Sequence, residues 1–287
     1  IHRFKRYMRY GVAALLLGAV AGLFIIRFSG KKTTVHPAAL QVKPVPDQVQ
    51  KIYATRYAEK KKIRLPDSSA VLLNAGSTLV LADDFGKTSR DIYLEGEAFF
   101  NVTHHKQVPF IVHMKNFDVK VLGTVFNVKA YPEDRTSEAS LIGGKIEVVM
   151  KNKKAEGLVL QPNQKVVIYN NTGTIPDSME PGKMDQKKIP QHTPVVRPLT
   201  STGEGHSFIE TAWTTGRLEI NNKPFAEIKA DLERLYNVHI YFKDDIVSGY
   251  RFSATFETEN ISQVLKALQL SYPFRYEMEN NRIVISK

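Results

Sequence analysis

The pair Gly123-Thr124 is the one place in this sequence where the polypeptide could do chemistry on itself. A threonine hydroxyl held against the preceding carbonyl can attack it and move the acyl group from nitrogen to oxygen, given strain and an oxyanion donor. Glycine on the other side of the bond minimises crowding. The competing interpretation is a strand corner, because strand glycines often mark bends.

Two other groups of side chains resemble catalytic or metal-binding sets. Glu95 and Glu97 would share one face of a strand, as an acid and base pair would, but the intervening Gly96 favours a turn or bulge. His104, His105 and His113 lack acidic partners at metal-ligand spacing, and adjacent strand residues point to opposite faces. We therefore expect no catalytic residue, no metal site and no cofactor.

Larger catalytic signatures are also missing from the sequence. It contains no nucleophile elbow, zinc-protease helix, phosphate-binding loop or dinucleotide glycine fingerprint. It also contains no cysteine, which excludes disulfides, thiolate metal sites and a cysteine nucleophile. The sequence therefore argues against an enzyme, and a periplasmic hydrolase stays only as a weak alternative.

The positive charge of the chain is concentrated at one end. The net charge is +11, but residues 1–64 hold 14 Lys/Arg against 2 Asp/Glu, whereas the remainder holds 26 against 27. A nucleic-acid-binding face would need its excess on a folded domain, while a basic flank suits anionic lipid headgroups. We expect no nucleic-acid partner.

An uncharged run of 17 residues extends from Tyr10 to Ile26 and is flanked by Lys and Arg on both sides. As a helix it would reach ~26 Å, near the short end of what crosses a bilayer core. The sequence after Ile26 lacks a small-x-small cleavage pattern, which favours an anchor over a signal peptide. Slightly denser basic residues on its N-terminal side favour a cytoplasmic N-terminus. Ala14, Gly18 and Gly22 have a spacing that lets two such helices approach closely.

Composition divides the rest of the chain into two candidate domains and two connectors. We expect an anchor with its basic flank over residues 1–28, a spacer over 29–53, a β domain over 54–170, a linker over 171–212 and a small domain over 213–287. The β domain shows short runs rich in Val, Ile, Phe and Tyr between turn residues, which predicts an all-β sandwich or roll. The linker is dense in Pro, Gly, Thr and charge.

The last 75 residues predict an α+β domain with the order β-α-β-β-α-β-β. Its first helix would carry Phe225, Ile228, Leu232 and Leu235 on one face, and Asn260 with Gln263 would form a capping pair before the second. Asn280-Asn281 predicts a tight hairpin turn, and Asp244-Asp245 a solvated turn. Exposed strand edges here could accept a partner's strand. The aromatic candidates for partner contact are Trp213, Phe225, Tyr236, Tyr241 and Phe242.

Four motifs, in order, resemble a known family. They are Leu65-Pro66-Asp67-Ser68-Ser69-Ala70-Val71-Leu72-Leu73-Asn74, Leu94-Glu95-Gly96-Glu97-Ala98-Phe99-Phe100-Asn101-Val102, Pro109-Phe110-Ile111-Val112 and Leu122-Gly123-Thr124-Val125-Phe126-Asn127-Val128. They resemble the periplasmic domain of FecR-type anti-sigma regulators. Residues 213–285 resemble the C-terminal domain that such regulators carry in Bacteroidetes, which is similar to the short domain of secretins and TonB-dependent transducers.

The resemblance implies a non-enzymatic, single-pass protein of the bacterial inner membrane whose C-terminal part is periplasmic. Such a protein receives a signal from an outer-membrane TonB-dependent receptor and controls an extracytoplasmic-function (ECF) sigma factor, and hence transcription. The resemblance also adds weight to self-cleavage between Gly123 and Thr124. The sigma-binding region expected before the anchor is not among these residues, so sigma contact would involve residues preceding Ile1.

One motif position departs from the family pattern. The family usually has glycine where this chain has Ser68, so either the turn differs here or Ser68 carries a small strain cost.

One other function remains as an alternative, a membrane-anchored envelope module that binds glycan or peptidoglycan. That alternative predicts aromatic and acidic residues clustered on one face, whereas the aromatic residues are scattered along the sequence.

Overall fold

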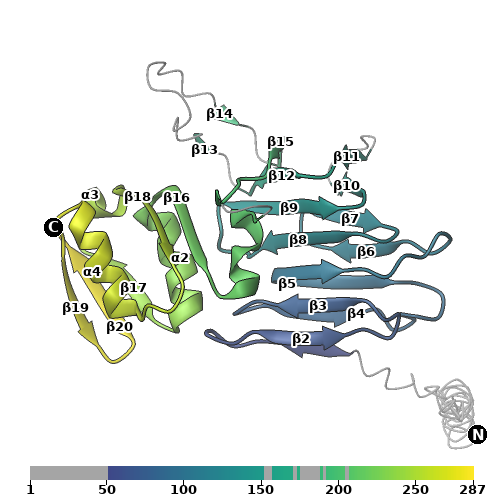
Figure 1. Ribbon diagram of the computed structural model, residues 1–287, viewed down its shortest axis with the longest axis horizontal. Coiled ribbons are helices and arrows are strands. Elements are labelled where there is room, and N and C mark those ends of the chain that lie inside the picture. The colour runs from purple at the N-terminus through teal and green to yellow at the C-terminus, as the bar shows by residue number, and fades with distance from the viewer. Residues whose placement is uncertain (1–50, 152–156, 171–172, 175–187, 190–191, 204–206) are drawn as a thin grey trace, which may run out of the picture. The chain divides into compact units, whose positions relative to one another are not determined.

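A computed structural model describes residues 51–287 apart from 152–156, 171–172, 175–187, 190–191 and 204–206 (Figure 1). The predicted anchor, Tyr10–Ile26, and most of the spacer lie outside the described residues. None of the described helices is both long enough and apolar enough to cross a bilayer. Residues 49–287 belong to one compact unit, which contains a β module followed by a small α+β module.

The β module is a 13-stranded sheet that folds over on itself. Its strands are β1 (Ile52–Ala54), β2 (Lys61–Arg64), β3 (Ala70–Leu73), β4 (Thr78–Leu81), β5 (Asp91–Asn101), β6 (Phe110–His113), β7 (Phe117–Val121), β8 (Val125–Ala130), β9 (Thr136–Gly143), β10 (Ile146–Met150), β11 (Leu158–Leu160), β12 (Gln164–Tyr169) and β15 (Pro194–Pro198). The prediction of an all-β domain followed by a small α+β domain is confirmed.

Strand β5 belongs to both halves of this sheet. Its first residues pair with β4 and β6, in a half with the order β11-β10-β7-β6-β5-β4-β1. Its last residues pair with β3 and β8, in a half with the order β2-β3-β5-β8-β9-β12-β15. Gly96 lies where β5 passes between them, with φ +113°, and a Cβ there would meet Ser77. Only glycine fits this crossing.

One hydrophobic core lies between the two halves. Side chains that alternate inward along the strands fill it, including the fully buried Phe100, Phe110 and Phe126. Phe100 stacks on Phe126 with 4.8 Å between ring centroids and meets Phe110 edge to face. These family-motif phenylalanines are therefore core residues. The opposite face of the second half, which we call the outer face, carries polar side chains and positions the site described below.

The segment predicted as a linker contributes to the sheet. Strand β15 pairs antiparallel with β12 and extends the module beyond residue 170, and β13 (Gly173–Thr174) pairs with β14 (Lys188–Ile189). Composition misses β15 because prolines stand at both of its ends. Proline is tolerated on an edge strand such as β15, where its missing N–H interrupts no ladder. A 3-10 helix, η1 (Ile209–Thr215), then leads into the next module.

The α+β module has the predicted order with one addition. Its elements are β16 (Leu218–Pro224), α2 (Phe225–Tyr236), β17 (His239–Phe242), α3 (Asp245–Ser248), β18 (Arg251–Phe256), α4 (Ile261–Ser271), β19 (Arg275–Glu279) and β20 (Arg282–Ser286). Helix α3 occupies the position where Asp244-Asp245 predicted a turn. β16 pairs with β18, and β17 pairs in parallel with β20, which also pairs with β19.

The local signals in this module are confirmed except at Leu235, which is half-buried and does not belong to the core that the other residues of its predicted helix face join. Asn260 and Gln263 form the predicted capping box at the start of α4. β19 and β20 form a hairpin around Asn280, whose φ is +53°. Phe225, Ile228 and Leu232 of α2 are buried in a second core, separate from that of the β module. Each module therefore has its own source of hydrophobic stabilisation.

Ser68 occupies a left-handed conformation with φ +68° in the turn before β3. Residues other than Gly, Asn and Asp are sterically disfavoured in this conformation, because their Cβ atom approaches the backbone too closely. We expect Ser68→Gly to raise the free energy of unfolding by about 0.5–1 kcal/mol, measured by urea denaturation. Ser68→Ala, which keeps the Cβ, should leave it nearly unchanged. Destabilisation by Ser68→Gly would show that the serine side chain contributes more than its backbone conformation costs.

Candidate functional site: a polar junction between the modules

The outer face of the sheet carries two rows of polar residues. Cross-strand pairing aligns Glu97 of β5, Lys129 of β8 and Glu138 of β9 in the first row. The second row aligns Asn127, Ser140 and Lys165 of β8, β9 and β12. Glu97, Asn127 and Ser140 are buried although they point away from the core. Another part of the protein must therefore cover this face.

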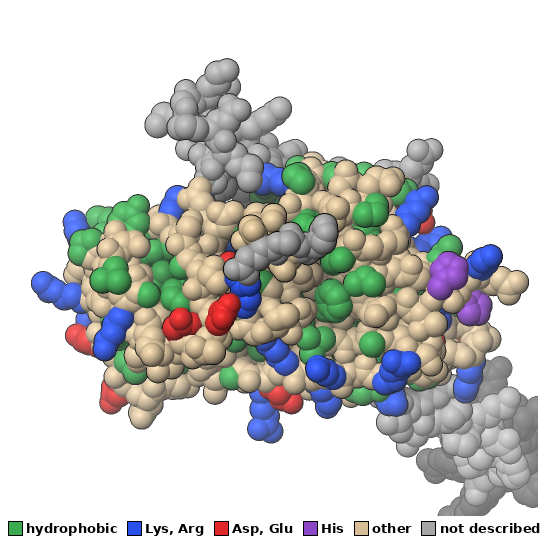
Figure 2. All heavy atoms as spheres, viewed as in Figure 1, with side chains coloured by type: hydrophobic (Ala, Val, Ile, Leu, Met, Phe, Trp, Pro, Cys, Tyr) green, Lys and Arg blue, Asp and Glu red, His purple; other side chains and the backbone are tan. Residues whose placement is uncertain are grey.

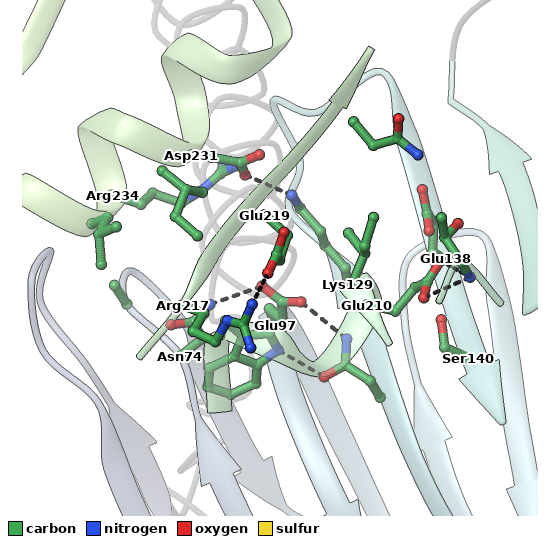
Figure 3. Close-up of a pocket in the computed structure, with 18 of the residues that line it drawn as sticks. Asn74, Glu97, Lys129, Glu138, Ser140, Glu210, Arg217, Glu219, Asp231 and Arg234 are labelled. Atoms are coloured by element: carbon green, nitrogen blue, oxygen red, sulfur yellow. Dashed lines mark hydrogen bonds and ion pairs between the residues drawn. The ribbon is translucent and has the colours of Figure 1, made fainter. Parts of the chain in front are cut away.

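The cover is formed by η1, β16 and α2 (Figure 3). Between these elements and the sheet lies a cleft of about 280 Å³. Arg217, Glu219 and Lys223 of the β16 region and Asp231 and Arg234 of α2 line it, together with both polar rows. We call this set of residues the junction.

Arg234 makes the most extensive contacts across the junction. Its guanidinium donates to both carboxylate oxygens of Asp134, at 2.9 and 3.2 Å, and to Glu133 at 2.9 Å. It also donates to Asp231, one turn away on α2, at 2.9 Å and lies 3.8 Å from the ring centroid of Tyr131. The arginine is only 5% exposed. Such a bidentate, stacked arrangement suits arginine and could not be reproduced by lysine.

Lys129 and Asp231 form the second connection. The lysine Nζ donates to Asp231 Oδ1 at 2.7 Å and lies 3.6 Å from Asp134. Burial alone would lower the pKa of Lys129, but the carboxylates of Asp231, Glu97 and Asp134 together raise it. Burial alone would raise the pKa of Asp231, but Lys129, Lys223 and Arg234 hold it well below its usual range. Both groups are therefore charged at neutral pH.

Glu97 of β5 is hydrogen-bonded to the loop after β3 and to β8, and through β8 to η1. Its carboxylate accepts from the side-chain amides of Asn74, at 2.8 Å, and Asn127, at 3.0 Å. The Oδ1 atom of Asn127 in turn accepts from Trp213 Nε1 at 3.1 Å. Burial raises the pKa of Glu97, against the lowering effects of Lys129 and the two amides. The family-motif residues Asn74 and Glu97 thus anchor the incoming 3-10 helix.

A third ionic contact lies at the other end of the polar rows. Lys165 Nζ lies 3.0 Å from Glu138 and 3.0 Å from Glu210 of η1. Burial would raise the pKa of Glu138, yet Lys165 lowers it overall. The charged groups of the junction pair with one another, and none of them is a nucleophile next to a general base. The junction is therefore built to hold two modules together, not to transform a substrate.

The ionic contacts predict how stability depends on pH. Because Asp231 and Glu138 have lowered pKa values in the folded state, that state binds fewer protons than the unfolded chain near their ordinary values of 3.8 and 4.5. Their stabilisation is complete above that range and is lost as the pH falls through it and below. Glu97 acts in the opposite direction, because its raised pKa makes ionisation above pH 4.5 costly.

We therefore expect urea midpoints of the wild type to fall steeply below about pH 5. The double variant Lys129→Met/Asp231→Leu, which lacks the central pair, should show a shallower fall. Parallel curves for the two proteins would contradict the assignment of the acid sensitivity to Asp231.

The other predicted site residues lie elsewhere. Thr124 is buried, and its hydroxyl donates to the Lys145 carbonyl at 2.9 Å. Gly123 packs against His104 so tightly that a Cβ there would lie 2.6 Å from His104 Cα. Glu95 is exposed whereas Glu97 is buried, so the two carboxylates do not share an environment. His113 contacts Asp118 at 2.9 Å, and the described residues include no group of three potential metal ligands.

The aromatic candidates separate into different environments. Phe225 lies fully buried in the second core, where it meets Phe242 edge to face, and is unavailable to a partner. Trp213 lies at the junction, and the Tyr236 hydroxyl donates to the Glu259 carbonyl. Tyr241, on the edge strand β17, is 49% exposed between Arg282 and Lys229. It is the most accessible of the five.

Lys129, Asp231 and Arg234 were not predicted as site residues. A signal for the first was present in its own strand, where Lys129 stands between the apolar residues Val128 and Ala130. Asp231 and Arg234 flank the apolar stripe of α2 three residues apart, which is also the pattern of an ordinary solvated helix edge. Nothing in the sequence pairs them with residues about one hundred positions earlier.

Fold and junction together define a protein of two modules joined by a polar junction, in which the described residues form no catalytic arrangement. Two family models match: "FecR protein" over residues 51–147 and "FecR, C-terminal" over residues 217–285. Two crystal structures of a "putative anti-sigma factor" from Parabacteroides distasonis match with 32% and 31% sequence identity. Each match has a TM-score of 0.68 and covers 83% of this chain and 99% of the solved chain. This chain belongs to the FecR family.

Family membership confirms the expectation from the four sequence motifs and assigns the chain to a non-enzymatic family. The match to the first model begins at the first described residue and includes β1 to β9 completely. The second spans β16 to β20 almost completely. A comparison with curated proteins found no match.

Proposed function

We propose that this protein is an anti-sigma-type transducer of the inner membrane. In this proposal residues 1–28 anchor it, residues 29–53 form a spacer, and the two modules lie in the periplasm. The α+β module receives a signal from an outer-membrane TonB-dependent receptor, and the cytoplasmic part of the protein acts on an ECF sigma factor. Support comes from FecR family membership, the uncharged run Tyr10–Ile26 and the lack of a catalytic arrangement among the described residues.

The junction is the observation that carries this proposal. A receptor that contacts the α+β module can affect the membrane side only if the two modules respond as one body. Ion pairs between the buried Arg234 and the largely buried Asp134, Lys129 and Asp231 provide such a coupling, because charges shielded from water lose much of their stabilisation when a partner moves away. The contacts therefore favour transmission of force or displacement through the β module.

The receptor-binding surface is proposed at Tyr241. This side chain is exposed on edge strand β17, and edge strands can add a strand from a partner. We expect Tyr241→Ala to weaken binding of the receptor's periplasmic signalling domain about 10-fold or more, measured by calorimetry. Tyr93→Ala is the matched control, since Tyr93 is 53% exposed on β5 of the other module. Equal losses for both variants would contradict this location.

A transcriptional reporter tests the relay itself. In cells that carry the cognate receptor and sigma factor, the inducing substrate should change reporter output with the wild-type protein. A chain truncated after residue 216 should not respond, although it still reaches the membrane fraction. A normal response from the truncated chain would refute a receptor-contact role for the α+β module. Binding to cell-wall sacculi without any reporter response would favour the envelope-module alternative.

Self-cleavage at Gly123-Thr124 stays a prediction. The hydroxyl that would attack is held by the Lys145 carbonyl, so it must leave this hydrogen bond first. Intact mass of the purified chain on standing decides between the two interpretations. An acyl shift followed by hydrolysis gives fragments that end at Gly123 and begin at Thr124, and Thr124→Val abolishes them. A strand corner gives only the full-length mass.

A further inference from the structure

Two edge strands bring basic side chains together where the described chain begins. β1 is the last strand of one half of the sheet, and β2 is the last strand of the other. Lys51 and Lys61 both lie over the ring of Tyr53, with Nζ 5.6 and 6.0 Å from its centroid. We call this edge of the sheet, with Lys51, Lys61, Lys62, Arg64 and Ile52, the basic face. Because side chains alternate along a strand, Lys62 and Arg64 point away from Lys61, and Ile52 points away from Tyr53, so these residues surround the edge.

The side chains of the basic face are open to solvent. All four cations are exposed, and Ile52 is 60% exposed. Figure 2 shows Lys and Arg side chains along the lower edge of the molecule, where Figure 1 places β2. From Lys51 to Arg64 the chain carries six Lys/Arg and one acid, Glu59, whose carboxylate accepts from the Arg56 backbone N–H. The face therefore presents almost unopposed positive charge.

We propose that the basic face docks on the anionic phospholipid headgroups of the membrane that anchors the chain. The proposal rests on the anchor predicted at Tyr10–Ile26, but not on the receptor relay. Clustered Lys and Arg attract an anionic leaflet within about one Debye length, which is ~8–10 Å at physiological salt. The exposed isoleucine and the tyrosine suit the interface between headgroups and acyl chains.

The tether makes even a weak attraction sufficient. Between Ile26 and Lys51 lie 24 residues, a length of chain that reaches at most about 85 Å when fully extended. The basic face thus samples the membrane at a high effective concentration. Docking would hold the β module in one orientation at the bilayer surface. The β module would then stay in place when a partner displaces the α+β module.

Lysines on edge strands also prevent unwanted strand pairing. This second role can be separated from lipid binding by charge reversal, since glutamate protects an edge as well as lysine does but is repelled by anionic lipid. The variant Lys61→Glu/Lys62→Glu/Arg64→Glu therefore tests the lipid role alone. Its matched control is Lys87→Glu/Lys115→Glu/Lys266→Glu, which makes the same change in net charge at exposed lysines elsewhere.

The absence of native cysteine permits a site-specific probe. Full-length chain carrying Ile52→Cys is labelled with an environment-sensitive fluorophore and placed in nanodiscs of phosphatidylcholine with or without phosphatidylglycerol. We expect a blue shift and reduced quenching by acrylamide only with phosphatidylglycerol, and both should disappear at high salt. The same label at Leu270→Cys, in the α+β module, should show neither effect. The charge-reversed face should lower the ratio of docked to free state about 100-fold, and the control triple should leave it unchanged.

Several outcomes would overturn the docking. They are an equal shift in both kinds of nanodisc, no shift in either, or equal losses in the two triple variants. A chain that co-elutes with neither nanodisc would also overturn it, because nothing would then hold the face near a bilayer. A protein that docks while its reporter stays silent would contradict the relay and leave the docking intact.

Discussion

Replacing Arg234 with leucine is expected to lower the free energy of unfolding by about 3–5 kcal/mol and to uncouple the two modules. The variant leaves the carboxylates of Asp134 and Asp231 in the junction with one cation fewer. It also removes the stacking on Tyr131. The loss is large because the arginine is buried, so water cannot replace the missing partner.

The uncoupling has its own signature in urea denaturation. Each module has a separate hydrophobic core, so without the junction each can unfold by itself. We expect one transition for the wild type, monitored by far-ultraviolet circular dichroism, and two for Arg234→Leu. Arg275→Leu, at an exposed position of β19, is the control and should retain one transition. A single transition with an unchanged midpoint for Arg234→Leu would contradict the coupling.

Lys129→Met is expected to destabilise the protein by about 3 kcal/mol, and the double variant Lys129→Met/Asp231→Leu to recover to within about 1 kcal/mol of the wild type. The single variant removes the closest cation, 2.7 Å away, from the Asp231 carboxylate, which is only 18% exposed. The double variant replaces both charges with apolar side chains, so the pair is removed as a whole, and the remaining losses are the weaker contacts of Lys223 with Asp231, at 3.4 Å, and of Lys129 with Asp134, at 3.6 Å. Arg234 keeps Asp134 and Glu133 in either case.

A double-mutant cycle measures this coupling directly. The control pair is Lys120 and Glu147, which are 3.6 Å apart but well exposed, so Lys120→Met should change stability by less than about 1 kcal/mol. Additive effects of the Lys129 and Asp231 substitutions would show that the two charges act independently. A double variant that is stable but gives no reporter response to the inducing substrate would show that the ion pair is needed for signalling more than for stability.

Much of the fold followed from local patterns. The alternation of apolar residues along β5 and β8 predicts strands with one face in a core, and Phe100 and Phe126 do lie there. The apolar stripe of α2, the capping pair at Asn260 and the turn at Asn280 each depend on neighbours a few residues away. The positive φ at Ser68 was one of two possibilities that the sequence itself raised. Short-range sterics and hydrogen bonding are sufficient for such features.

Predictions from local composition were wrong where they conflicted with the pairing of strands in the tertiary structure. The prolines around β15 are typical of a linker, yet this segment adds an edge strand to the sheet. Gly96 predicted a turn or bulge, and the structure uses it to carry β5 from one half of the sheet to the other. Both features depend on which strands lie alongside, and a single stretch of sequence does not contain that information.

The sequence by itself determined the elements, the two-module order and the family motifs, because periodicity, caps and turns are local properties of the chain. Only the tertiary structure decided that the polar rows on the outer face are covered, and that Arg234 and Lys129 meet carboxylates about one hundred residues away. Alternation tells which side chains share a face of a strand, but burial of that face depends on a second module docking there. The sequence pattern places these charged side chains on a solvated surface. They form the junction because docking of the second module excludes water from them.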